Sequence, residues 1–69
     1  MTTVNKLEQA LAGAKGLASQ LKTFGLDTDD QQAKQMFNQL ATTMENTTQM
    51  LQSRLDYVKN EEPQYNQQQ

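Results

Sequence analysis

The sequence predicts an all-α protein, an antiparallel helical hairpin that dimerises into a four-helix bundle. Two stripes of apolar residues recur at helical spacing, and one short break separates them. The first stripe holds Val4, Leu7, Leu11, Ala14, Ala18 and Leu21, with Leu17 and Phe24 beside it. The second stripe holds Ala33, Phe37, Leu40, Met44, Thr47, Leu51, Leu55 and Val58. A chain of 69 residues buries little of its surface alone, which favours association with a second copy.

The first helix is expected over residues 3–24, give or take a residue. Its apolar steps alternate between three and four residues, which is the heptad pattern of a seam between packed helices. Thr2 or Thr3 can cap its amino terminus, because a hydroxyl accepts a hydrogen bond from the free N–H groups of the first turn. Gly13 and Gly16 each lower helix stability by about 1 kcal/mol relative to alanine. This helix is therefore expected to depend on packing against the second.

The turn is expected over residues 25–28. Gly25 is predicted just past the first helix in the left-handed conformation, which glycine adopts without a Cβ penalty. In this kind of cap, Leu26 packs back on Leu21. The alternative is one continuous helix through Gly25. The short polar residues 27–30 argue against it, because such side chains disfavour helix interiors.

The second helix is expected over residues 29–60, with similar tolerance. Thr28 and Gln31 match a capping box, in which Thr28 caps the helix. Asp29 and Asp30 place negative charge at the positive end of the helix dipole. The stripe departs from strict heptad spacing, which suits a nearly straight helix.

The hairpin is expected to span residues 1–62. Pro63 ends the second helix in this prediction, because proline disfavours helical geometry at the residue before it. Residues 63–69 have nothing to bury and are predicted to be disordered.

The candidate core and interface residues lie on the two stripes. They are Leu7, Leu11, Leu21, Phe24, Phe37, Leu40, Met44, Leu51, Leu55 and Val58. The longer second helix is expected to project past the start of the first, so Leu55 and Val58 need cover from another chain. Met36 and Met50 flank the second stripe, where a second hairpin would pack.

Composition argues against catalysis, cofactors and metals. The chain has no cysteine and no histidine, which removes thiolate sites, the commonest general base and the commonest metal ligand. Two thin helices offer little concavity for an active site. Asp27 and Asp29 could begin a calcium loop, but Gln32 and Asn38 stand where an EF-hand needs glycine and glutamate. We therefore expect the turn's aspartates to cap the helix, and we expect a protein that is not an enzyme.

Charge and hydropathy argue against nucleic-acid and membrane-spanning partners. The net charge is -2 and the six Lys and Arg residues are scattered, whereas phosphate binding needs clustered cations. The apolar runs fall far short of the ~20 residues that span a bilayer, and no secretory signal is visible, so a cytoplasmic protein is expected. A membrane-surface helix is an open alternative, since Lys6, Lys15 and Lys22 accompany the first stripe.

Five segments together carry a resemblance to a known family. They are residues 4–12 (VNKLEQALA), Lys15-Gly16, Phe24-Gly25-Leu26, residues 32–37 (QAKQMF) and residues 61–65 (EEPQY). With them, the whole chain resembles a small-protein family of endospore-forming Bacillales, catalogued as domain of unknown function 1657. The resemblance implies a sporulation context and a location in the forespore or spore. It also implies that relatives are encoded beside the genes of the spore membrane channel that moves dipicolinic acid. The family has no established activity or binding residue, so none is carried over.

Two functions follow as expectations. The first is a non-catalytic structural or interaction protein that acts by self-association, as a homodimer. The second, implied by the resemblance, is a regulatory subunit that docks on a spore membrane protein.

Overall fold

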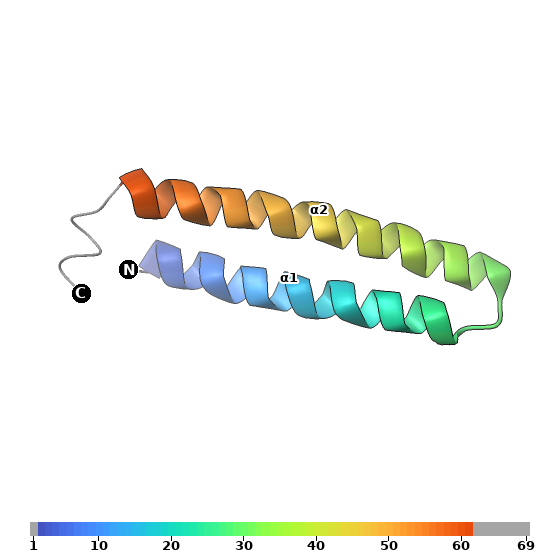
Figure 1. The fold of residues 1–69 in the computed structure, drawn as a ribbon. Helices are drawn as coiled ribbons and strands as arrows, with labels where there is room; N and C mark the ends of the chain where they lie inside the picture. The colour runs from blue at the N-terminus through green and yellow to red at the C-terminus, as the bar shows by residue number, and fades with distance from the viewer. Residues whose placement is uncertain (1, 62–69) are drawn as a thin grey trace.

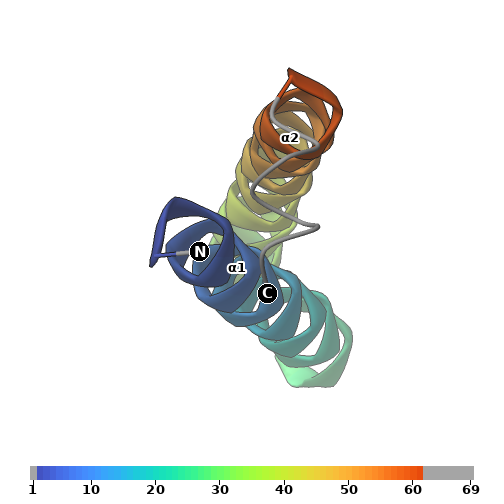
Figure 2. The same cartoon turned by 90° about the vertical axis from the view of Figure 1, so that its left-hand side faces the viewer.

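A computed structural model describes residues 2–61, and all regular structure in that range is helical. Helix α1 spans Thr2–Asp27 and helix α2 spans Gln31–Glu61. The two helices lie side by side and run in opposite directions (Figure 1). Seen from the end where α1 begins, the described residues form two adjacent helices without a third layer (Figure 2). The predicted all-helical hairpin is therefore confirmed, whereas the predicted tail over 63–69 lies outside the described residues.

Helix α1 packs on α2 through one continuous stripe. Its buried residues are Val4, Leu11, Ala14, Ala18, Leu21 and Gly25, and Leu7 is half-buried between them. The steps alternate between three and four residues, so these residues occupy the a and d positions of a heptad repeat. The structure thus buries the predicted stripe of the first helix and extends it by one step, to Gly25.

The matching stripe of α2 differs from the prediction. It runs through Phe37, Ala41, Met44, Thr48, Leu51, Leu55 and Val58, all of which are buried or half-buried. This spacing keeps the strict heptad pattern, so the predicted departure from it is wrong. Ala41, only 3% exposed, is the most buried side chain of the core, whereas Leu40 beside it is 43% exposed.

Contacts near the turn define how the two stripes face each other. A Cβ atom added to Gly25 would lie 3.4 Å from the Cβ of Phe37, so these residues are opposite each other. Antiparallel helices in this register place Leu21 opposite Ala41, and Leu7 opposite Leu55. Near the turn, small residues therefore face large ones, whereas the opposite end of the hairpin pairs large residues with large ones.

The main apolar cluster lies at the open end of the hairpin, away from the turn. Its buried members are Val4, Leu11 and Leu55, with Leu7, Leu51 and Val58 packed against them. The predicted projection of Leu55 and Val58 beyond α1 is wrong, because α1 itself covers them. No large side chain among the described residues is less than 2% exposed, so the core is thin even here.

The turn is shorter and later than predicted. Helix α1 continues through Gly25 to Asp27, and only residues 28–30 leave helical geometry. No glycine of the described residues has a positive φ, so the predicted left-handed cap at Gly25 is wrong. Leu26 is 80% exposed, so its predicted packing on Leu21 is wrong as well. The Thr28 N–H instead donates to the Phe24 carbonyl at 3.1 Å and closes the last turn of α1.

Helix α2 is capped by Asp30 rather than by Thr28, as its capping bonds show. The Gln32 N–H donates to Asp30 Oδ1 at 3.0 Å, which is the bond expected of an N-cap residue. The Lys34 N–H donates to the Asp30 carbonyl at 2.9 Å and starts the helix. Thr28 bonds within the turn that precedes the helix, because its Oγ1 accepts a hydrogen bond from the Asp30 N–H at 3.3 Å. The predicted capping role of Thr28 is therefore wrong, and Thr28 shapes the turn instead.

Substitution of the cap should lower stability measurably. We expect Asp30→Ala to lower the free energy of unfolding by about 1 kcal/mol, which shifts the melting temperature of a domain this small by roughly 4–8 °C. Asp29→Ala is the matched control, since it removes the same charge from the turn without removing the cap bond. Thermal melts followed by circular dichroism at one protein concentration test this, and equal shifts in both variants would contradict the assignment.

Candidate interaction surface

The two stripes that face each other form the seam of the hairpin, and the seam separates two flanks that differ in chemistry. The paired flank comprises the e positions of both helices, which are Glu8, Lys15, Lys22, Asn38, Glu45, Gln52 and Lys59. The open flank comprises the g positions of both helices and the neighbouring c positions of α2 between residues 10 and 50, which are Ala10, Leu17, Phe24, Ala33, Met36, Leu40, Thr43, Thr47 and Met50. The next g position of α2, Arg54, borders this flank toward the open end. In antiparallel helix pairs, e positions meet e positions and g positions meet g positions, so each flank runs along both helices.

The paired flank holds two ion pairs that bridge the helices. Lys22 pairs with Glu45, and the Lys59 Nζ lies 3.4 Å from Glu8 Oε2. All four side chains remain substantially exposed to solvent, so each pair contributes only about 0–1 kcal/mol. These pairs orient the helices and leave this flank polar.

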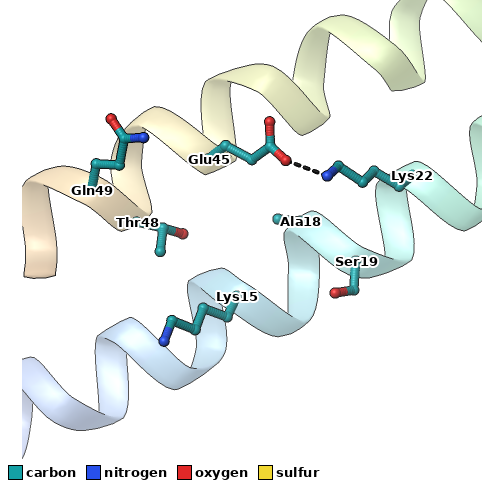
Figure 3. A pocket seen from close by; sticks show the side chains of 7 residues that line it. All are labelled: Lys15, Ala18, Ser19, Lys22, Glu45, Thr48 and Gln49. Atoms are coloured by element: carbon teal, nitrogen blue, oxygen red, sulfur yellow. Dashed lines mark ion pairs between the residues drawn. The ribbon is translucent and has the colours of Figure 1, made fainter.

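A shallow hollow of about 570 Å³ lies on the paired flank. Its lining residues are Lys15, Ala18, Ser19, Lys22, Glu45, Thr48 and Gln49. Figure 3 shows Lys22 and Glu45 meeting across the helices while Lys15 points away from that pair. The lining offers neither histidine nor cysteine, and its acid is already engaged by a lysine, so it lacks the nucleophile–base arrangement of an active site.

The open flank is apolar and exposed. Leu17 and Leu40 are each 43% exposed, Phe24 and Met36 are each 48% exposed, and Met50 is 74% exposed. None of the nine residues that define this flank carries a charge, although Arg54 borders it. Isolated apolar residues are ordinary on a protein surface, but a contiguous stripe along two helices is typical of an interaction site.

Phe24 links the open flank to the seam. Its ring meets the ring of Phe37 edge to face, with 5.7 Å between centroids. Phe37 is half-buried in the seam, whereas Phe24 remains about half exposed. The Phe24 ring therefore contacts the seam on one side and leaves the rest of its surface on the open flank.

A second hollow follows the outer surface of α2 at the edge of the open flank. It is lined by Asn46, Gln49, Met50, Ser53, Arg54 and Tyr57. The Arg54 guanidinium carbon lies 5.0 Å from the centre of the Tyr57 ring, within the range of a cation–π contact. The cation is thus already matched within the chain, at the end of the flank farther from the turn.

The structure separates the predicted core and interface residues into three groups. Leu11, Leu21 and Leu55 are buried, whereas Phe24 and Leu40 are exposed and are not core residues of the single chain. The half-buried ones are Leu7, Phe37, Met44, Leu51 and Val58. Ala41 is the core residue that the prediction missed.

Two further features concern metal binding and membrane crossing. Among residues 2–61, no group of three or more acidic, histidine or cysteine side chains is placed to hold a metal ion. Neither described helix combines the length and hydropathy that a bilayer-crossing segment needs.

Fold and surface together define a small antiparallel helical hairpin with one polar and one apolar flank. The chain belongs to the family described as Protein of unknown function (DUF1657), whose family model matches residues 7–55. That range contains nearly all of the seam and the whole of the open flank. No curated protein and no solved structure matches the chain significantly.

Proposed function

We propose that this protein is a non-catalytic interaction module that acts by binding a second copy of itself through the open flank. Two hairpins would then form an antiparallel four-helix bundle. The observation that carries the proposal is the exposed, uncharged row of Leu17, Phe24, Leu40 and Met36 beside a thin core. Covering this row would give each helix the wider apolar face that helices of four-helix bundles bury.

The size of the face fits a stable dimer. A helix rises about 1.5 Å per residue and is about 10 Å across, so a face two helices wide and as long as α1 covers about 800 Å². α1 has 26 residues, and standard interfaces bury about 800 Å² on each partner. The hairpin therefore offers enough surface on one side for specific association.

The chemistry of the face favours a second copy over a charged partner. The residues that define the open flank include no carboxylate and no cation, and Arg54 at its border already contacts the Tyr57 ring. Both copies of the chain carry the same net charge of -2, and a neutral contact face brings them together without desolvating those charges. A self-complementary apolar face is what a two-fold symmetric interface requires.

Sedimentation equilibrium at micromolar concentration tests the proposal. We expect a species of twice the chain mass of 7.8 kDa, and we expect Leu40→Lys to weaken the dimer by at least roughly tenfold, since about 1.4 kcal/mol suffices for that change. Leu26→Lys is the matched control, because Leu26 lies outside the open flank and is already exposed. A cooperatively melting monomer at these concentrations would overturn the proposal.

The cellular setting belongs to the same proposal. Sporulation in endospore-forming bacteria, in the cytoplasm, forespore or spore, is supported only by the sequence resemblance described above. If the protein instead serves as a regulatory subunit of a spore membrane protein, a foreign helix would take the open flank. The folded monomer named above would favour that alternative.

A further inference from the structure

The apolar residues of the open flank are unevenly distributed along the hairpin. Leu17, Phe24, Met36 and Leu40 lie in the half nearer the turn, as the register of Gly25 opposite Phe37 shows, whereas Met50 is the one large apolar residue of the flank in the other half. Toward the open end, the same side of the hairpin carries the exposed cations Lys6 and Arg54. Most of the large apolar residues therefore lie in one half of the flank, and the two cations lie beside the other half. Asp27, at the same heptad position as Lys6, lies at the turn itself.

A two-fold dimer can join such flanks in two ways, and polarity distinguishes them. If the turns lie at opposite ends, full overlap places Lys6 and Arg54 of one copy over the apolar half of the other and desolvates them. If the turns lie at the same end, the apolar halves cover each other and the cations stay at the solvated rim. The second arrangement stacks α1 of each copy on α2 of the other, whereas the first stacks like helices on each other. Neighbouring helices are antiparallel in both arrangements, so charge and not helix direction distinguishes them.

We infer that the two hairpins dock with their turns at the same end and that Phe24 packs between Met36 and Leu40 of the second copy. The inference rests on the proposed self-association. Phe24 lies at the level of Asn38, midway between Met36 and Leu40, in the register of the hairpin. The acidic turns then come near each other, but Asp27, Asp29 and Asp30 are exposed and their repulsion is screened over about 8 Å at physiological salt.

Spin-label distances in the full chain test the arrangement directly. The chain has no native cysteine, so Gln31→Cys labels only the turn end and Asn60→Cys labels only the open end; both positions are exposed and off the open flank. In the inferred dimer, each variant gives an intermolecular distance of roughly 20–30 Å, set by the helix spacing and the reach of the labels. Adding Leu40→Lys to either labelled variant should abolish that distance.

Each other outcome has a definite meaning. Distances on the order of 40 Å or more in both single variants, with a short distance when the two are mixed, would place the turns at opposite ends. That result would overturn the inference and leave the proposed self-association standing. No intermolecular distance in any sample, together with a monomeric mass, would overturn both.

Discussion

Replacing Leu55 by alanine should unfold this protein or nearly so. Leu55 is 4% exposed and lies at the centre of the apolar cluster at the open end. Truncating a buried leucine lowers the free energy of unfolding by about 2–5 kcal/mol, because transfer energy is lost and a cavity remains. A single core in a chain of this length supplies only about 3–5 kcal/mol, so little stability would remain.

A thermal melt followed by circular dichroism, at one fixed protein concentration, measures this effect. We expect the Leu55→Ala transition to fall by at least ~10 °C or to vanish. Leu26→Ala removes the same atoms from a side chain that is 80% exposed, so its melt should match the parent's. A Leu55→Ala protein as stable as Leu26→Ala would contradict the position of the core.

Placing valine at Gly25 should separate the helices at the turn. Gly25 is buried in the seam, and an added Cβ would lie 2.8 Å from Asn38 Oδ1 and 3.4 Å from the Phe37 Cβ. The Asn38 amide can rotate away, but the Phe37 Cβ is fixed to the backbone of α2, and the branched methyl groups of valine need more room. Overpacking of this kind lowers the free energy of unfolding by about 1–3 kcal/mol.

The same substitution at Gly16 provides the comparison. An added Cβ at Gly16 meets nothing within 4 Å, and valine is a slightly better helix former than glycine, by a few tenths of a kcal/mol. We therefore expect Gly16→Val to melt at or slightly above the parent temperature and Gly25→Val to melt below it. Equal melting temperatures would show that α2 does not approach Gly25 closely.

The stripe of α1 could be predicted because large aliphatic residues mark most of its steps. Leu7, Leu11 and Leu21 establish the alternation of three and four, and Ala14 and Ala18 fit between them. Helix periodicity is the strongest signal that a single sequence offers, and it also predicted two helices joined by a short turn.

The stripe of α2 was harder to predict because its seam includes residues of weak hydrophobicity. Ala41 and Thr48 occupy seam positions, whereas the more apolar Leu40 lies on the flank. A prediction that takes the most apolar residue in each helical turn therefore moves the stripe from the seam toward the flank. The available signal was the unbroken heptad spacing from Phe37 to Val58.

The role of Gly25 depends on a tertiary contact that local sequence does not contain. A glycine after an apolar helix has two explanations, a left-handed cap or a close approach of another helix. Residue 25 is also the next step of the α1 seam after Leu21, and that spacing indicates the second explanation. The placement of Met36 and Met50 on the flank needed no tertiary information, because both fall outside the stripe at helical spacing.

The position of the apolar cluster also determines how the chain gains stability as it folds. Val4 and Leu7 meet Leu55 and Val58 there, so the cluster joins the most distant parts of the described chain. Closing the turn first brings together only the small–large pairs near Gly25, which bury little. Loop-closure entropy rises slowly with length, so the remote contacts cost little more to form than the near ones. A hairpin in which only the turn end has formed is therefore barely stabilised, and folding should be all-or-none.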